Sequence, residues 1–364
     1  MRTMMRKAIT GLMICAIMMC AACNAETFKP LTVTVVSEDQ FGGIQLSINK
    51  LDLEYGDSIN LSFSGGYEER SVPYYPDFFG DKGQTVVNDY FDYILVTKIN
   101  ESFTKNTGVT AGETVTITLD ERGKYKEILE AYNVDVNKTR REDQTEEAFI
   151  NAREVTGGNI APGVLYRGSS PTDKSFGRTD LMAAYIADKG INCILDLSDT
   201  EEKIAEYDQI PDLIRTMYDN GQLLALGLGI DLSDARNREI LGQGLIRMFS
   251  MDGPYLIHCS YGRDRTGFLC AYLEALCGAP YEAIIDDFMF SYDALHAIDM
   301  NPESLQYKLF KQRIDDEMSG TLGIAIEDLP TADLESATRR FFGECGMSEE
   351  QIDHMKEILT QQRG

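Results

Sequence analysis

Residues 258–267 constrain this chain more tightly than any other stretch. Their sequence, His-Cys-Ser-Tyr-Gly-Arg-Asp-Arg-Thr-Gly, follows an apolar run at 254–257 and precedes a helical pattern at 268–273. This order predicts a strand, a tight loop and a helix. Gly262 lets the loop turn without a side chain that obstructs a ligand. We therefore expect a loop that presents its backbone amides at the start of a helix.

The spacing of Cys259 and Arg265 points to phosphate chemistry. Loop amides and the positive end of the helix dipole converge on one point, which binds a phosphate dianion and favours a thiolate. The planar guanidinium of Arg265 binds two phosphate oxygens, and this interaction strengthens in the transition state. Thr266 offers a hydroxyl to the departing thiolate, and His258 is expected to hydrogen-bond the loop backbone. The expected phosphate-binding residues are Ser260, Tyr261, Gly262, Arg263, Asp264 and Arg265.

The loop resembles the bacterial tyrosine/serine phosphatase branch of the cysteine-dependent protein tyrosine phosphatase superfamily. The loop of that branch reads His-Cys-x-x-Gly-Lys-Asp-Arg-Thr-Gly, and Arg263 keeps the charge of its lysine. The segments 151–155 and 165–171 are similar to the branch's opening motifs, and 338–359 is similar to its helical tail. The resemblance implies a cysteinyl-phosphate intermediate, phosphotyrosine as the default substrate, and no cofactor. Arg167 either supports the loop from behind or forms a surface ion pair.

The departing oxygen needs a proton donor, and a carboxylate can later activate water. The resemblance implies an aspartate about thirty residues before the cysteine, which favours Asp231 and then Asp234, or the loop aspartate, Asp264. We favour Asp231 and Asp264 equally, and we rank Asp196 third. Each has a structural alternative: Asp231 as a helix cap, Asp264 as a partner of loop amides, and Asp196 as a tie between turns.

Charge and composition exclude several other functions. A net charge of −25 and a pI near 4.5 argue against a nucleic-acid partner, because nothing neutralises the backbone phosphates. The three histidines lie near no cluster with metal-ligand spacing. Five cysteines beyond Cys23 show no paired spacing, so no disulfide framework is expected. Cys270 and Cys277 are expected to fill a helix core face.

The N-terminus has the pattern of an export signal. Residues 1–22 combine a basic start, an apolar run at 8–19 and small residues. Ala21, Ala22 and Cys23 resemble a bacterial lipoprotein box, which implies lipidation of Cys23 and a membrane-anchored location in the cell envelope. Plain secretion and a retained single anchor stay open as alternatives. Residues 23–30 are expected to form a tether.

The rest of the chain predicts two domains. Residues 31–135 contain alternating, β-branched runs, which predict a small all-β domain of unknown role. Aromatic residues there favour core packing over a ligand surface: Tyr67, Tyr74, Tyr75, Phe78 and Phe79. The charged stretch 136–150 is interpreted as a linker or solvated helix face. Residues 151–361 alternate strands and helices, which predicts an α/β phosphatase domain whose parallel-rich sheet is flanked by helices.

These features favour an exported phosphomonoester hydrolase, most simply a protein tyrosine phosphatase; dual specificity stays open. Its expected partner is a phosphorylated protein or a small phosphomonoester. Two alternatives stay open: an inositol-phosphate or phosphoinositide phosphatase, and a non-catalytic phosphate-binding envelope lipoprotein. A rhodanese-type sulfur transferase also uses a loop cysteine, but residues 264–267 fit that class poorly.

Overall fold

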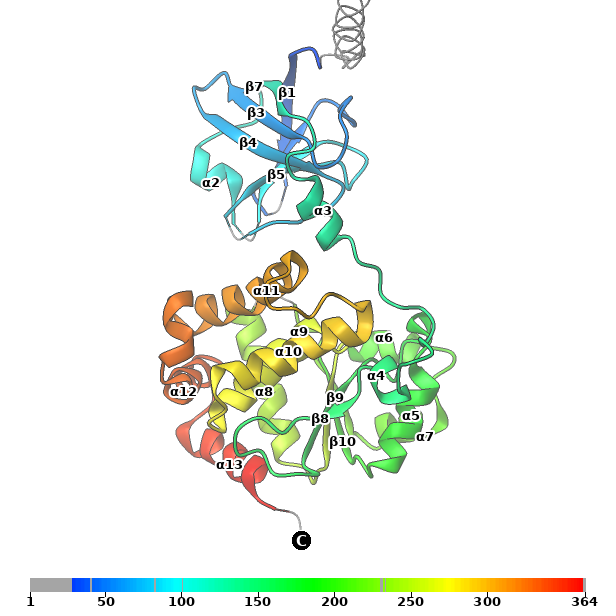
Figure 1. Cartoon of the computed structure of the whole chain (residues 1–364). Coiled ribbons are helices and arrows are strands. Elements are labelled where there is room, and N and C mark those ends of the chain that lie inside the picture. Colours follow the sequence, from blue (N-terminus) through cyan, green and yellow to red (C-terminus); the bar gives the residue numbers. More distant parts are fainter. Residues whose placement is uncertain are drawn as a thin grey trace, which may run out of the picture. The chain divides into compact units, whose positions relative to one another are not determined.

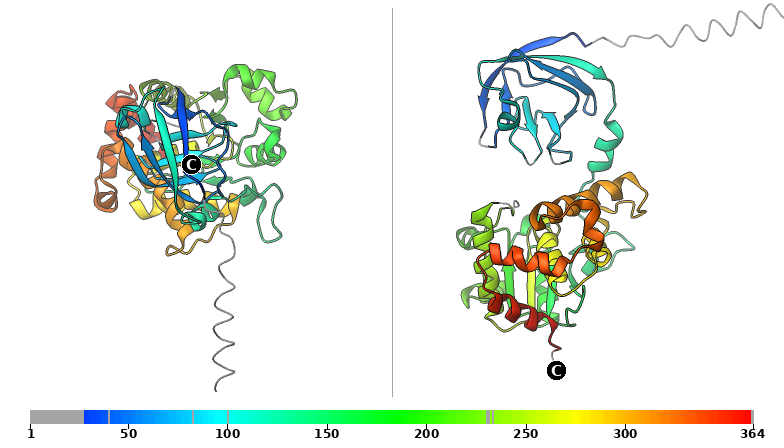
Figure 2. Two further views of the ribbon diagram at one scale, coloured as in Figure 1. Left: turned by 90° about the horizontal axis from the view of Figure 1, so that it is seen from above. Right: turned by 90° about the vertical axis from the view of Figure 1, so that its left-hand side faces the viewer.

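The computed structural model describes residues 28–362, apart from 40, 82, 100, 230, 231 and 233. The chain divides into two compact units, residues 1–130 and 131–364, which are described separately (Figures 1 and 2). The expected signal segment, Cys23 and Asp231 lie outside the described residues, so export, lipidation and the role of Asp231 stay predictions. None of the helices in the described part is long and apolar enough to cross a membrane.

The first unit is a closed barrel of seven strands, in the order β1-β2-β6-β5-β4-β3-β7. Only β4 and β5 pair in parallel among these neighbours. Its interior is apolar and includes Ile59, Leu61 and Val96. The strands are β1 Leu31–Glu38, β2 Ile44–Leu46, β3 Ser58–Phe63, β4 Glu68–Tyr75, β5 Thr85–Asn88, β6 Leu95–Lys98 and β7 Thr114–Glu121.

The barrel corrects the expectation of an all-β domain. It contains a short helix, α2 Phe103–Thr107, capped by the Ser102 side chain and closed by Gly108 at φ 75°. A second helix, α3 Lys126–Tyr132, follows β7. The sequence pattern also missed β4 and β5. Tyr74 and Tyr75 of β4 are buried, which confirms core packing for these two aromatic residues, whereas Phe78 is exposed.

The second unit is built on a five-stranded sheet in the order β11-β10-β12-β9-β8. The four longer strands are parallel, and β8 pairs antiparallel with β9. The parallel-rich sheet expected from the alternating pattern is therefore present. The strands are β8 Arg153–Glu154, β9 Leu165–Gly168, β10 Cys193–Asp196, β11 Leu223–Ala225 and β12 Tyr255–His258.

Helices cover both faces of this sheet (Figure 1). Alternate residues of the strands enter two apolar clusters, as expected for strands buried on both faces. Ile257 packs in the cluster that includes α8 to α13, and Leu256 packs in the cluster that includes α5 to α7. The helices are α4 Glu146–Phe149, α5 Thr179–Asp188, α6 Glu201–Glu206, α7 Asp212–Asp219, α8 Ala235–Phe249, α9 Asp264–Leu276, α10 Tyr281–His296, α11 Leu305–Leu322, α12 Leu334–Glu344 and α13 Glu349–Thr360.

Local signals predicted some helix boundaries and missed others. The sequence Ser-Glu-Glu-Gln at 348–351 predicts a capping box, and it is confirmed at the start of α13, because the side chains of Ser348 and Gln351 each bond the other residue's backbone. Thr179 precedes the helical pattern at 180–187, which predicts an N-cap role for it; this prediction is wrong, since the helix already includes Thr179 and begins without a side-chain cap. The described cysteines are buried and free, as expected for Cys270 and Cys277.

Candidate active site

The predicted loop lies between β12 and α9, at the carboxyl edge of the parallel strands. Cys259 follows β12 directly and is 4% exposed, and α9 begins at Asp264. The ends of β9 and β10 flank it on both sides, because these strands pair with β12. The loop therefore sits where ligands bind in open α/β sheets.

The loop is held from outside through its carbonyl oxygens. The amide of Asn151 donates to the carbonyls of Tyr261 and Gly262, both at 3.0 Å. The backbone N–H of Ser170 donates to the Ser260 carbonyl at 3.1 Å. These bonds engage the carbonyls of three successive loop residues and fix the loop against the neighbouring segments.

Arg167 supports the loop from behind. Its side chain is 0% exposed, and its Nη2 donates to the Gly262 carbonyl at 2.9 Å. Its Nη1 pairs with Asp287 of α10, which also accepts from Arg153 Nε at 2.6 Å. Burial opposes ionisation of Asp287, but Arg153 and Arg167 outweigh it and hold the pKa of its carboxyl below its usual range. Of the two interpretations of Arg167, the buried support is the one observed.

Gly262 meets a conformational and a steric requirement. Its φ is 67°, and a Cβ at this position would lie 2.2 Å from the Gly168 carbonyl oxygen. Any other residue would be strained in the left-handed region and would also clash with the end of β9. The glycine therefore sets how closely the loop approaches the neighbouring strand.

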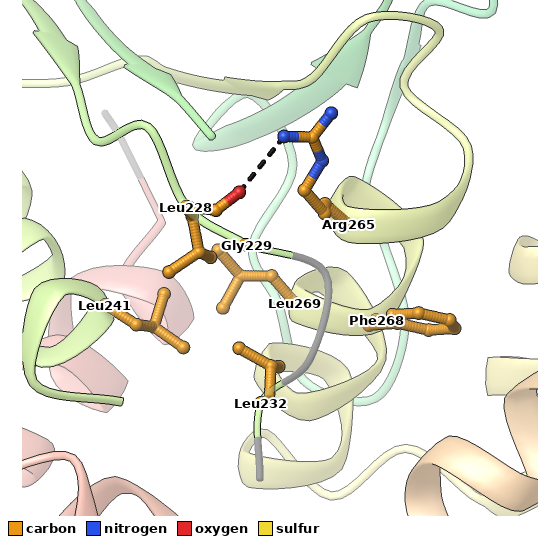
Figure 3. A pocket seen from close by; sticks show the side chains of 7 residues that line it. All are labelled: Leu228, Gly229, Leu232, Leu241, Arg265, Phe268 and Leu269. Carbon is orange, nitrogen blue, oxygen red and sulfur yellow. Dashed lines mark hydrogen bonds between the residues drawn. The ribbon is translucent and has the colours of Figure 1, made fainter. Parts of the chain in front are cut away.

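Arg265 lies on the first turn of α9 and extends toward the ends of β10 and β11 (Figure 3). Its Nη1 donates to the carbonyls of Leu228, at 3.1 Å, and Leu197, at 3.4 Å. Its aliphatic part borders a small apolar pocket that also includes Leu232, Leu241 and Leu269. These contacts fix the guanidinium beside the loop.

Asp264 turns toward α10 and α11. Its carboxylate accepts from Arg263 Nη2 at 2.9 Å and from the Tyr292 hydroxyl at 3.2 Å, and Arg313 lies 3.6 Å away. Burial opposes ionisation, but Arg263 and Arg313 outweigh it and hold the pKa of the Asp264 carboxyl well below its usual range. The residue is therefore a carboxylate at neutral pH.

The sequence model of the tyrosine phosphatase family matches residues 147–361. This span is more than half of the chain and contains the whole loop. The chain belongs to the tyrosine phosphatase family. It is thus a phosphatase hydrolase by family, whereas the bacterial branch inferred from the loop is a finer assignment.

Three solved structures resemble parts of this phosphatase. An uncharacterized conserved protein from Thermotoga maritima is 19% identical, covers 25% of this chain and 39% of its own, and has a TM-score of 0.22. The core catalytic domain of the PP-IP phosphatase SIW14 from S. cerevisiae is 20% identical; the match covers 47% of this chain and 94% of that domain, with a TM-score of 0.26. Cydia pomonella PTP-2 phosphatase is 21% identical; the match covers 43% of this chain and 89% of that chain, with a TM-score of 0.25. The comparison with curated proteins gave no match.

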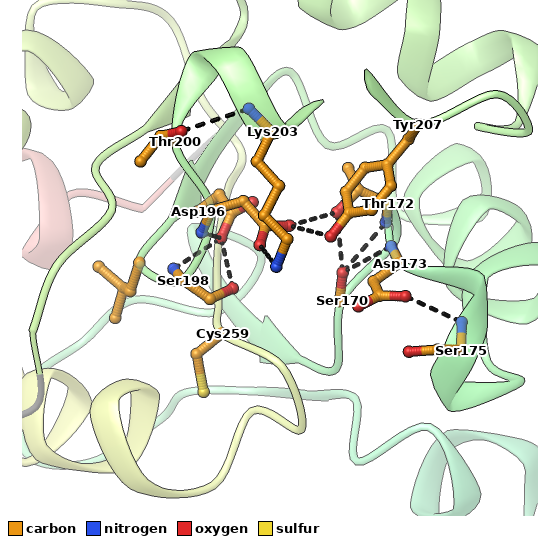
Figure 4. A network of polar contacts seen from close by, with 12 residues as sticks. Ser170, Thr172, Asp173, Ser175, Asp196, Ser198, Thr200, Lys203, Tyr207 and Cys259 are labelled. Carbon is orange, nitrogen blue, oxygen red and sulfur yellow. Dashed lines mark hydrogen bonds and ion pairs between the residues drawn. The ribbon is translucent and has the colours of Figure 1, made fainter. Parts of the chain in front are cut away.

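The other predicted carboxylates of the phosphatase have structural contacts. Asp234 is the N-cap of α8 and accepts from the amides of Arg236 and Asn237. Asp196, which is fully buried, accepts from the Ser198 backbone N–H and hydroxyl, both at 2.8 Å (Figure 4). The structural alternative weighed for Asp196 is therefore present, and the helix-cap role belongs to Asp234.

Several buried polar atoms of residues in or beside the loop have no partner among the described residues. Among them are Thr266 Oγ1, Asp196 Oδ2 and His258 Nε2. His258 Nδ1 lies 3.3 Å from the Cys259 carbonyl oxygen, as expected for a contact with the loop backbone. Because unsatisfied buried polar atoms are costly, these groups are suited to meet water or ligand atoms. The Thr266 hydroxyl is thus available for the role predicted for it.

A second polar network lies at the ends of β9 and β10 near Cys259 (Figure 4). At its centre Asp199 accepts from Lys203 Nζ at 3.0 Å, from the Tyr207 hydroxyl at 3.2 Å and from Thr172 at 3.3 Å. Burial raises the pKa of Tyr207 to about 12, so its hydroxyl stays a donor. Sequence reasoning did not identify this network.

Residues that support the loop from other elements were also missed. Asp287, Ser291, Tyr292 and His296 all lie on α10, and the available signal was polar side chains at helical spacing within an apolar pattern. Arg313 on α11 carried no such signal. In the described residues, no group of three or more His, Cys, Asp or Glu side chains is arranged to hold a metal ion.

Proposed function

We propose that this phosphatase hydrolyses phosphomonoesters through a cysteinyl-phosphate intermediate on Cys259. The observation that carries the proposal is the loop itself, where Cys259 precedes a helix start and Arg265 is fixed beside it. The sulfur attacks phosphorus, and the bond to the leaving oxygen breaks. Water then attacks the phosphorus, which releases phosphate and the Cys259 thiolate.

Charge stabilisation comes from groups that are already oriented. Loop amides and the N-terminus of α9 face the phosphoryl oxygens, and Arg265 offers a planar pair of donors. Such donors act without reorganisation when negative charge develops in the transition state. The free hydroxyl of Thr266 is proposed to donate to the sulfur as it departs in the second step.

Asp231 is the better candidate for the proton donor. A donor must carry a proton when the ester bond breaks, whereas Asp264 is ionised and occupied by Arg263, Arg313 and Tyr292. Asp234 caps α8, and Asp196 Oδ1 bonds its own turn. These contacts suit Asp264 to holding the loop and count against the described candidates, so we propose Asp231, the best positional match in the sequence, as the proton donor.

The proposed substrate is phosphotyrosine in a protein. An inositol ligand carries additional phosphates that need further cations, and Arg167 and Arg263 are the candidates that the sequence offers for them. Arg167 is fully buried behind the loop, and the guanidinium of Arg263 is engaged by Asp264 and His296. These contacts support an inositol-phosphate substrate less well than a substrate with a single aryl phosphate, such as phosphotyrosine. An exported, lipid-anchored enzyme remains our proposal for its location.

Turnover of an aryl phosphate by the full chain tests this function. We expect activity that survives a metal chelator, is blocked by vanadate and is lost in Cys259→Ser. Cys345→Ser is the matched control, because Cys345 is buried at the end of α12, outside the loop and the helix that follows it. Full activity of Cys259→Ser would refute the mechanism. Binding of phosphate without any turnover would instead favour the phosphate-binding lipoprotein.

A further inference from the structure

The segment from Val134 to Gln144 is docked on the phosphatase unit. The sequence pattern suggested a solvated linker, whereas this segment binds the C-terminal end of α10. The last four carbonyls of a helix have no i+4 amide within the helix, so capping residues, water or donors from other segments bond them. Three donors of the docked segment bond such carbonyls: Asn137 N to Leu295 O at 2.8 Å, Gln144 Nε2 to Ala294 O at 2.6 Å, and Arg141 Nη1 to Asp293 O at 3.3 Å, which also accepts from Ala297 N.

The docked segment also sets the proton position of His296, the last residue of α10. The Nδ1 of His296 lies 3.1 Å from the carbonyl oxygens of both Val134 and Asp135. Carbonyl oxygens only accept, so Nδ1 carries the proton and Nε2 keeps its lone pair. Nε2 contacts Arg263 Nη1 and accepts from it. Burial, and then the charge of Arg263, lowers the pKa of His296 to about 4, so the ring is neutral.

A second contact path runs through Arg178, which is 2% exposed. Its Nη2 donates to the Asn137 carbonyl at 2.6 Å, and its Nε donates to the Phe149 carbonyl at 2.8 Å. Its guanidinium carbon lies 5.8 Å from the centre of the Tyr261 ring. Arg178 therefore joins the docked segment to the loop at Tyr261, two residues before Arg263.

We propose that residues 134–144 are a positioning element of the phosphate-binding loop. The segment holds His296, which holds Arg263, while Arg178 links Asn137 to Tyr261. Displacing the segment would free the last turn of α10 and loosen the loop at both residues. The kinetic part of this proposal rests on the proposed function. The structural part, that the loop is ordered by the docked segment, stands without it.

The first test replaces His296 in the full chain. His296→Phe removes both the donor and the acceptor, whereas His296→Gln can keep one of each. We expect His296→Phe to lower kcat by about five- to tenfold, the effect of one lost hydrogen bond. Amide exchange of residues 259–264 should rise in the same variant, and His296→Gln should restore most of both. His354→Phe, on the exposed side of α13, is the matched control.

The second test acts from the segment itself. Gln144→Glu places a carboxylate against the Ala294 carbonyl, so the segment should detach and its amides should exchange faster. The proposal predicts faster exchange of residues 259–264 as well, together with a lower kcat. Unchanged loop exchange and kcat alongside a detached segment would overturn it. Amide exchange can be measured whether or not the wild type hydrolyses an ester. An inactive wild type would therefore contradict the proposed function and leave the structural part of this proposal testable.

Discussion

The loop of residues 258–267 and the barrel of strands β1 to β7 are stabilised in different ways. Within the described part of the barrel, Asp57 is the one charged side chain in the buried class. Around the loop, buried acidic and basic side chains are more frequent: Arg167, Arg178, Asp196 and Asp199. Burying charge is costly unless each group is paired, so hydrophobic packing suffices where only a fold is needed. The difference indicates that the charges around the loop are kept for its geometry.

The contacts of the buried charges support this comparison. Asp57 ties a turn of its own unit, accepting from the Gly123 and Glu54 amides and pairing with Arg122. Arg167, in contrast, donates to a carbonyl of the loop and pairs with Asp287 of α10. Four predictions test whether the two regions differ as this contrast requires.

The largest effect is expected at Arg265. Arg265→Lys keeps the charge but loses the planar pair of donors, so kcat should fall by about 100-fold, as for the loss of one transition-state donor. Steady-state kinetics with an aryl phosphate measure this. Arg339→Lys, on α12, is the control and should leave kcat unchanged. A kcat for Arg265→Lys close to that of the wild type would remove Arg265 from the mechanism.

Arg167→Met tests the buried pair directly. The substitution removes one of the two positive charges that offset the buried negative charge of Asp287, and it removes the donor to the Gly262 carbonyl. The free energy of unfolding should therefore fall by about 3–5 kcal/mol. The matched change in the barrel is Arg122→Met. The Arg122 side chain is 43% exposed, so its loss should cost about 1 kcal/mol or less. Urea unfolding of both variants gives the comparison, and equal losses would contradict it.

Asp264→Asn should show a pH-dependent loss of stability. A carboxyl whose pKa is lowered on folding stabilises the protein above its unfolded pKa of about 3.9, and this stabilisation disappears as pH falls through the lower folded value. The variant should therefore be less stable than the wild type at pH 7, and the gap should narrow below pH 4. Urea unfolding at several pH values measures the gap. A constant gap would mean that the charge of Asp264 is not the cause.

The smallest effect is expected in the barrel at Tyr74. Its buried hydroxyl donates to Asp89 at 2.9 Å, so Tyr74→Phe should lower the stability of the barrel by about 1 kcal/mol. Because Tyr74 belongs to the other unit, kcat should not change. Thermal unfolding and aryl phosphate turnover of the same samples provide both readings. A clear loss of kcat would show that the barrel and the loop are not independent in this respect.

Several features could be predicted because their causes are local. The order of strand, loop and helix around Cys259 follows from adjacent residues, and so does the capping box of Ser348 and Gln351. The parallel sheet follows from alternating strands and helices. Short strands such as β5 were missed by the sequence pattern, because the strands that they pair with decide whether they form. The start of α5 was misplaced, because the preceding turn sets it and periodicity does not.

The sequence alone predicted the chemistry that we propose for this chain, since one loop of ten residues carries the proposed nucleophile, the proposed phosphate-binding arginine and the glycine that shapes the turn. Tertiary structure alone decided what holds that loop. Asn151 reaches it from the turn after α4, and Arg167, His296 and Arg313 reach it from β9, α10 and α11; the burial that neutralises His296 depends on packing across the whole unit. Electrostatic environment is set by distance in space, which the order of residues does not specify.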